Sequence, residues 1–298
     1  MRSGVLILAG PTASGKTELA IELAKRFDAE IVGADSRQIY RGMPVGTAAP
    51  TPEQLCAVPH HLIGFLDPRE RYSAARFSAD ATRIIEDIQA RGKRAIVAGG
   101  TGFYIRALTG AVDLAPQYDE AVRERLAHEA KLHEPQFLYE WLSVRDPRRA
   151  AMLHAGDAYR VMRALEIALA PRESTVRAEP LLSLATRNLP FLKLFLEIDT
   201  ADLDRRIERR TDAMLAGGLL DEAERIGADA VAANAVGYPQ TLAYLRGWST
   251  LRELRALLAR ATRRYARRQA AWFRSEPQTQ RARAADVERL ARENLRWV

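Results

Sequence analysis

The feature that most constrains this chain is a glycine-rich octapeptide close to its amino terminus. Residues 10–17 read Gly-Pro-Thr-Ala-Ser-Gly-Lys-Thr and match the pattern G-x-x-x-x-G-K-[ST]. They follow a continuous apolar run from Val5 to Ala9 and precede a segment whose apolar residues recur every three or four positions. A strand buried on both faces, a tight turn and an amphipathic helix are therefore expected in that order.

This turn has the chemistry of a phosphate cradle, the P-loop. Its glycines let successive backbone N–H groups point at phosphate oxygens, and the helix amino terminus adds positive potential. Lys16 supplies a point charge, and the Thr17 hydroxyl can hold Mg²⁺, so Mg²⁺ is the expected cofactor. Gly15 is expected to adopt a backbone conformation that is costly for other residues. The expected diphosphate-binding residues are Gly10, Pro11, Thr12, Ala13, Ser14, Gly15, Lys16 and Thr17.

Strand-like runs alternate with an amphipathic segment beyond this turn. Short apolar runs at Glu30 to Ala34 and Arg94 to Ala98 lie on either side of the segment from Ala74 to Ala90. This alternation predicts an α/β fold with a P-loop NTPase-like, mostly parallel sheet flanked by helices. In such sheets the ligand crevice lies beyond the carboxyl ends of the strands.

The composition changes between residues 113 and 190. This stretch is rich in Arg, Glu, Ala and Leu at helical spacing and has no convincing strand before Phe191 to Ile198. We expect an inserted all-helical lobe over residues 113–190, which ends in a proline-rich return linker from about Ala170 to Pro190. The P-loop core then comprises residues 1–112 and 191–298 and includes basic carboxyl-terminal helices.

Asp35 follows the second expected strand, so its carboxylate should project into the same crevice as the P-loop. Three roles are open to it. It could hold Mg²⁺ through water, serve as a general base, or cap the amino end of a following helix.

A run of small residues, Gly99-Gly-Thr-Gly102, terminates the third strand-like segment. A glycine pair at the end of a strand permits either a sharp turn or the close approach of a ligand. On its own this run indicates no particular function.

Taken together, the motifs resemble those of bacterial tRNA dimethylallyltransferases, the IPP transferase family. The matching segments are the P-loop, Asp35-Ser-Arg-Gln-Ile-Tyr40, Gly46-Thr-Ala-Ala-Pro50, Gly99 to Gly102, Asp157 to Glu166, Arg206 to Arg210, Val236-Gly-Tyr238 and Thr262 to Arg274. The resemblance covers nearly the whole chain. Three departures concern individual tRNA contacts: Ala49 replaces a usual lysine, Pro239 replaces a commonly charged residue, and the linker near Pro171 is atypical.

The resemblance implies that the exocyclic N6 of an adenine beside the anticodon attacks C1 of dimethylallyl diphosphate and expels pyrophosphate. Lys16 and, by the family pattern, Arg210 would stabilise the departing diphosphate, which is where the barrier is chiefly lowered. Asp35 would accept or orient the amine proton, and Thr101 would hydrogen-bond near the adenine. The base must be unstacked to reach the allylic carbon, and the small residues from Gly99 to Gly102 would leave room for it.

The same resemblance implies a set of tRNA contacts and partners. The implied contacts are Asp35, Ser36, Arg37, Gln38, Thr101, Arg123, Tyr159, Arg160, Val161, Met162, Arg163, Gly237, Tyr238, Arg267, Arg268, Gln269, Trp272 and Arg274. The expected partners are the tRNA anticodon loop and dimethylallyl diphosphate. We expect a cytoplasmic monomer with no membrane partner.

A basic helix is predicted from Leu251 to Arg274, in a chain whose formal net charge is +7. Arg260, Arg263, Arg264 and Arg267 share one face, beside an apolar stripe that includes Tyr265 and Trp272. Two interpretations of the arginine face stay open, namely contact with an RNA backbone and a solvated face with internal carboxylate pairs. Tyr265, Trp272 and Phe273 could stack on bases, but aromatic residues at helical spacing more often belong to the core, and none of the three is assigned a catalytic role.

Other function classes remain as alternatives. A small-molecule or nucleotide kinase would share the cradle and the sheet, although the basic helix argues against it. A non-catalytic RNA-binding module with a relic P-loop would bind tRNA without turnover. The single cysteine, Cys56, excludes an internal disulfide, and the five histidines form no cluster with zinc spacing.

Overall fold

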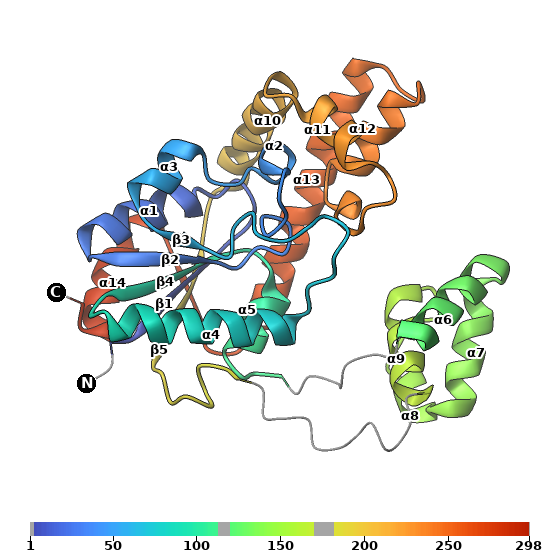
Figure 1. Ribbon diagram of the computed structural model, residues 1–298, viewed down its shortest axis with the longest axis horizontal. Coiled ribbons are helices and arrows are strands. Elements are labelled where there is room, and N and C mark those ends of the chain that lie inside the picture. The colour runs from blue at the N-terminus through green and yellow to red at the C-terminus, as the bar shows by residue number, and fades with distance from the viewer. Residues whose placement is uncertain (1–2, 113–119, 170–181, 298) are drawn as a thin grey trace. The chain divides into compact units, whose positions relative to one another are not determined.

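The computed structural model describes residues 3–112, 120–169 and 182–297 (Figure 1). Contacts between Cα atoms divide the chain into two compact units, one of residues 1–112 and 181–298 and the other of residues 113–180. Each unit is described separately below. The atypical linker near Pro171 lies outside the described residues.

A single six-stranded sheet forms the centre of the first unit, with the strand order β3-β2-β4-β1-β5-β6. All neighbouring strands are parallel, which confirms the predicted sheet type. The strands are β1 (Val5–Ala9), β2 (Ala29–Gly33), β3 (His60–His61), β4 (Arg94–Gly99), β5 (Phe191–Leu196) and β6 (Thr279–Ala282).

Helices cover both faces of this sheet because its central strands are apolar on both sides. Helices α1 (Lys16–Arg26) and α14 (Val287–Leu295) pack on one face, where Leu6, Leu8 and Leu194 are fully buried. Helices α4 (Ala74–Ala90) and α5 (Gly102–Leu108) lie on the other face (Figure 1).

The helices between β5 and β6 in the sequence lie beyond the carboxyl ends of the strands (Figure 1). Helix α13 (Leu251–Arg274) has the predicted bounds and packs along α10 (Thr200–Ala216). The shorter elements are α2 (Pro44–Thr47), α3 (Pro52–Ala57), α11 (Leu219–Ile226), α12 (Tyr238–Leu245), and the 3₁₀ turns η2 (Val231–Asn234) and η3 (Ala284–Asp286).

The second unit is helical throughout its described residues. It comprises α6 (Glu120–Leu132), α7 (Pro135–Arg145), α8 (Pro147–Ala150) and α9 (Ala158–Leu169). Its core includes the buried side chains of Leu126, Leu142 and Leu165, one from each of the three longer helices. Within each helix buried residues lie four positions apart, as Leu138 and Leu142 do in α7, which is the spacing that predicted the lobe.

The chain rejoins the first unit earlier than the sequence suggested. The Leu184 N–H donates to the Leu108 carbonyl at 2.8 Å, and the Leu184 side chain is fully buried. Ser78 Oγ also donates to the Leu182 carbonyl at 2.6 Å. Residues 182–190, which we had expected to close the lobe, therefore pack with the sheet.

Over the ranges given above, no helix combines the length and the apolar character needed to cross a membrane. Cys56 is a free, exposed cysteine.

Candidate active site

The carboxyl ends of three neighbouring strands bring the predicted catalytic segments together. β1, β4 and β2 are adjacent, and the last residue of β1, Ala9, lies opposite the last residue of β4, Gly99. The P-loop follows β1, Asp35 follows β2, and Thr101 follows β4. Because parallel strands end at the same edge, these three segments meet above that edge.

The P-loop has the strained backbone that its glycines allow. Gly15 caps the amino end of α1 in a left-handed conformation, with φ 90° and ψ 16°, which confirms that its backbone is one that is costly for other residues. A Cβ at Gly15 would lie 2.8 Å from Arg206 Nη1. The Arg206 guanidinium therefore lies directly against the loop, and any side chain at position 15 would displace it.

Lys16 is folded back over the loop that precedes it. Its Nζ donates to the carbonyl oxygens of Gly10 at 3.0 Å and Pro11 at 2.7 Å. The pKa of Lys16 is lowered to about 8, mainly by burial, and the charge of Arg210 also lowers it, while the charge of Asp35 raises it. A bound phosphate would supply the anion that a lysine in this environment lacks.

Asp35 and Thr101 are held by the backbone of the segment between β2 and α2. Asp35 Oδ1 accepts the Arg37 N–H at 2.8 Å, which turns the chain immediately after the carboxylate. Thr101 Oγ1 accepts the Ser36 N–H at 2.9 Å and lies 3.3 Å from Ser36 Oγ. Thr101 makes no side-chain cap to α5, so its hydroxyl serves the crevice rather than the helix.

The charge of Asp35 acts on the two cations assigned to the diphosphate. It raises the pKa of Lys16 and also raises the pKa of Arg210, which burial otherwise lowers. These directions agree with the fold, in which Lys16 and Asp35 follow the strands on either side of β4 and Arg210 is hydrogen-bonded to the Thr47 carbonyl.

Arg210 reaches the crevice from α10 and is anchored by the α2 turn. Its Nη2 donates to the Thr47 carbonyl at 3.2 Å. Gln38 Nε2 donates to the same carbonyl at 3.2 Å and to the Ala48 carbonyl at 3.0 Å. A residue predicted to bind the diphosphate and a predicted tRNA contact thus share one acceptor, the Thr47 carbonyl.

The glycines after β4 do not leave the space that we expected for a base. A Cβ at Gly100 would lie 2.1 Å from Gln269 Nε2, and a Cβ at Gly102 would lie 2.2 Å from Trp272 Cδ1. Both neighbours belong to α13. In this structure the small residues let α13 approach the sheet edge closely, which corrects the earlier interpretation.

Several predicted tRNA contacts lie in the protein interior. Tyr238 and Val161 are fully buried, and Gln269 is 5% exposed. Gly237 is also buried and caps α12 with φ 106°. A side chain enclosed by protein cannot reach RNA in this conformation, so the role of these residues here is to pack the core or to position their neighbours.

The other implied contacts of the helical unit are accessible to different degrees. Tyr159 is 69% exposed, and Arg160 is exposed beside Asp157 at 3.4 Å. Met162 packs against the core of the unit. Arg123 and Arg163 converge on the buried carboxylate of Glu166, at 3.5 Å and 2.8 Å, which fixes both guanidinium groups.

Helix α13 divides its arginines into two groups. Arg255 and Arg263 form ion pairs with carboxylates of α10: Asp212 lies 2.6 Å from Arg255, and Asp204 lies 3.0 Å from Arg263. The exposed arginines without an ion pair to any described residue are Arg252, Arg260, Arg264, Arg267, Arg268 and Arg274. Of the two interpretations of the arginine face, pairing with carboxylates of the protein therefore holds for Arg263. Contact with an RNA backbone suits the exposed arginines that have no ion pair.

The residues around Thr17 suit Mg²⁺ only together with a phosphate ligand. Within residues 3–112, 120–169 and 182–297, no group of three or more His, Cys, Asp or Glu side chains could hold a metal ion. Thr17 lies in the first turn of α1, and its hydroxyl has no hydrogen-bond partner in that part of the chain. A hydroxyl, phosphate oxygens and water are a ligand set that Mg²⁺ commonly takes.

The sequence did not indicate a role in or near the site for three residues. Tyr265 was assigned to the core, but the charge of Asp35, after burial, raises the pKa of its phenol, so it borders the crevice. Arg206 belongs to a matching motif, yet its contact with Gly15 depends on the tertiary fold. Glu222 looks like an ordinary polar residue of an amphipathic helix, although it is 3% exposed.

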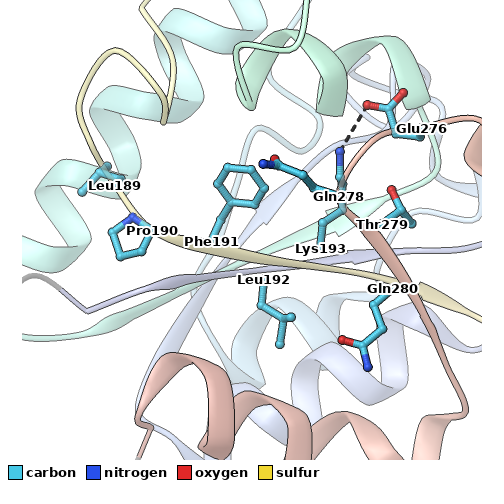
Figure 2. A pocket seen from close by; sticks show the side chains of 9 residues that line it. All are labelled: Leu189, Pro190, Phe191, Leu192, Lys193, Glu276, Gln278, Thr279 and Gln280. Carbon is cyan, nitrogen blue, oxygen red and sulfur yellow. Dashed lines mark hydrogen bonds and ion pairs between the residues drawn. The ribbon is translucent and has the colours of Figure 1, made fainter.

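A separate cavity of about 610 Å³ lies at the amino ends of β5 and β6. Figure 2 shows the Lys193 side chain directed at Glu276, and its Nζ donates to Glu276 Oε1 at 3.2 Å. Ligands of parallel sheets bind at the carboxyl ends of the strands, and this cavity lies at the opposite end. The ion pair satisfies both groups, so the cavity is not part of the candidate active site.

Two family models match the chain. One is described as IPP transferase and matches residues 38–276, and the other is described as isopentenyl transferase and matches residues 3–72. A tRNA dimethylallyltransferase of Anaeromyxobacter sp. (strain K) is 45% identical over 98% of this chain and 97% of its own length. A tRNA dimethylallyltransferase of Geobacter sulfurreducens is 40% identical, over 93% of this chain and 90% of its own.

Solved structures show the same similarity. A tRNA isopentenylpyrophosphate transferase from Bacillus halodurans matches with a TM-score of 0.69 and 34% identity, covering 98% of this chain and 95% of that one. A eukaryotic dimethylallyltransferase acting on tRNA matches with a TM-score of 0.74 and 26% identity, covering 97% and 76%. From the family models and these relatives, which span nearly its full length, the chain belongs to the IPP transferase family.

Proposed function

We propose that this protein transfers a dimethylallyl group from dimethylallyl diphosphate to the exocyclic N6 of an adenine adjacent to the anticodon in tRNA, releasing pyrophosphate. The observation that carries the proposal is that the P-loop, Thr101 and Asp35 follow the neighbouring parallel strands β1, β4 and β2 at one edge of the sheet. This arrangement supports a reaction between an amine and a diphosphate, with Asp35 as the carboxylate near the phosphate-binding loop.

At the diphosphate end, the protein stabilises the leaving group. As the C1–O bond of the substrate breaks, both electrons of that bond go to the diphosphate, whose negative charge increases. In this proposal the P-loop N–H groups, Lys16 and Arg210 stabilise that charge. Mg²⁺ held at Thr17 would supply further charge neutralisation to the diphosphate oxygens.

At the amine end, the N6 lone pair forms the new bond to C1, and one N6 proton must then leave. Asp35 is the carboxylate available to accept or orient that proton. The Thr101 hydroxyl, held by Ser36, would hydrogen-bond to the adenine and select its orientation. The base must leave its stack to reach this point.

In this proposal the RNA backbone is bound by surface residues outside the crevice. The exposed α13 arginines that have no ion pair among the described residues offer guanidinium groups to backbone phosphates; they are Arg252, Arg260, Arg264, Arg267, Arg268 and Arg274. Tyr159 and Arg160 of the helical unit are exposed for a second contact. We propose that the enzyme acts as a monomer in the cytoplasm. A kinase would use the same cradle but has no need of a basic helix beside it.

The test is incubation of the protein with unmodified tRNA, Mg²⁺ and dimethylallyl diphosphate, followed by mass analysis of the nucleosides. The proposal requires adenosine with an added five-carbon unit and an equal amount of pyrophosphate. If the tRNA is unchanged and a phosphoryl group passes from ATP to a small acceptor, the proposed function is wrong and the protein is a kinase.

A further inference from the structure

A buried carboxylate on α11 is held only by hydrogen bonds. Glu222 Oε2 accepts the Val45 N–H at 2.9 Å, and its Oε1 accepts the Gly46 N–H at 2.7 Å and the Tyr238 hydroxyl at 2.6 Å. Glu222 has no ion pair with any residue of the described ranges. A buried carboxylate without a cation is costly unless its oxygens are satisfied, so these contacts define where it sits.

The two N–H groups bound by Glu222 belong to the α2 turn, whose other end faces the candidate active site. The Thr47 carbonyl accepts the hydrogen bond from Arg210, and the Thr47 and Ala48 carbonyls accept those from Gln38. α2 has only four residues. A shift at its amino end therefore moves the carbonyls that hold Arg210 and Gln38.

The orientation of Arg210 depends on this turn. Among the described residues, the Arg210 side chain has one hydrogen-bond partner, the Thr47 carbonyl, and its buried Nε has none. Without the Thr47 carbonyl, the guanidinium would have no oriented contact in the free protein.

Tyr238 closes the same contact from α12. A Cβ at Gly46 would lie 2.6 Å from Tyr238 Cε2 and from its hydroxyl oxygen, so only glycine fits between the ring and the turn. The Tyr238 ring thus packs against α2, while its hydroxyl donates a hydrogen bond to the Glu222 carboxylate. The motifs around Gly46 and Tyr238, far apart in the sequence, are two sides of one contact.

We infer that Glu222 is a positioning residue that acts through α2 on Arg210 and Gln38. The inference rests on the proposed function, in which Arg210 binds the departing diphosphate. Glu222 touches no substrate in this scheme. Its carboxylate fixes the turn, the turn fixes the guanidinium, and the guanidinium is thereby already in place when the diphosphate arrives.

The direct test is Glu222→Gln, measured by prenyl transfer and by the Kd of pyrophosphate. The amide keeps the volume but offers one acceptor oxygen where the carboxylate has two, so one backbone N–H loses its partner. We expect kcat to fall by up to about 100-fold, and pyrophosphate to bind more weakly. Both losses should largely disappear when Glu222→Gln is made in an Arg210→Lys background, because the two residues act by one route.

The matched control is Glu30→Gln. Glu30 is 2% exposed and accepts from Arg91 Nη2 at 2.9 Å, in the β2 strand but upstream of Asp35. This variant should unfold more easily while keeping kcat and the pyrophosphate Kd within about twofold of wild type. A loss of activity like that of Glu222→Gln would mean that any buried carboxylate has this effect.

Equal effects of Glu222→Gln in the wild-type and Arg210→Lys backgrounds would overturn the inference, as would unchanged kcat and pyrophosphate Kd. If Glu222→Gln fails to fold, Tyr238→Phe removes one hydrogen bond and keeps the ring, and a smaller loss that depends on Arg210 is expected. Pyrophosphate binding does not require prenyl transfer. A wild-type protein that binds pyrophosphate but leaves tRNA unmodified would refute the proposed function, while the coupling of Glu222 to Arg210 could still be measured and would decide the inference.

Discussion

Gln269 and Thr12, 257 positions apart in the chain, are joined by a hydrogen bond of 2.8 Å from the Thr12 N–H to Gln269 Oε1. The Gln269 amide also donates to the Gly100 carbonyl at 3.0 Å. One buried side chain of the basic helix therefore ties the P-loop to the segment after β4. The helix that is proposed to contact RNA is thus mechanically connected to the loop that is proposed to hold the diphosphate.

The first prediction concerns this connection. Gln269→Leu leaves the Thr12 N–H and the Gly100 carbonyl without their partner, which should lower the free energy of unfolding by about 1–3 kcal/mol. The looser P-loop should raise the KM for dimethylallyl diphosphate. Urea unfolding and steady-state kinetics measure the two effects. A stable variant with an unchanged KM would show that Gln269 does not position the loop.

The second prediction concerns the glycine at the start of α5. Gly102→Ala places a Cβ 2.2 Å from Trp272 Cδ1, so it should destabilise the protein by about 1–3 kcal/mol through overpacking. Trp272→Leu should relieve most of this cost in the double variant, because the clash is with the indole ring. Denaturant unfolding of the two single variants and the double variant provides the measurement. If the losses simply add, Gly102 is small for some reason other than the approach of α13.

The sequence predicts the local elements of the site, but not the contacts between segments that are distant in the chain. The strand, turn and helix around Gly15 follow from local patterns, since each element is specified by residues that are neighbours in the chain. The contact between Thr12 and Gln269, and that between Gly46 and Tyr238, depend on how distant segments pack. The sequence shows which residues are small or polar but not which neighbour requires them to be so.

The third prediction is a dependence of stability on pH. The hydrogen bond from Arg91 lowers the pKa of Glu30 from 4.5 to about 2, with a further contribution from His61. Because the folded-state pKa is depressed, the stabilisation is fully present above pH 4.5 and is lost as the pH falls through 2. The difference in stability between wild type and Glu30→Gln should therefore shrink from pH 5 towards pH 2, as urea unfolding at each pH would show. A difference that stays constant over this interval would contradict the assignment.

The fourth prediction separates the two groups of α13 arginines. Arg264 has no ion pair among the described residues, so Arg264→Ala should weaken tRNA binding and reduce the slope of log K against log salt by about one. Arg255 is paired with Asp212 and Glu208, so Arg255→Ala should leave that slope unchanged. Titrations of tRNA at several salt concentrations test both. Equal changes for the two variants would mean that the ion pairs do not divide the face by function.

The fifth prediction concerns the carboxylate on which the proposed chemistry depends. Asp35→Ala removes a carboxylate whose charge, like that of Glu18, raises the pKa of both Lys16 and Arg210. Asp35→Asn removes the same charge but keeps an oxygen for the Arg37 N–H. The most direct measurement is turnover of both variants under saturating substrates, alongside their Kd for tRNA. We predict a loss of turnover of about 10²- to 10⁴-fold with little change in the Kd. Comparable losses in turnover and tRNA affinity, or near-normal turnover in Asp35→Asn, would contradict the assignment of Asp35 to the amine proton.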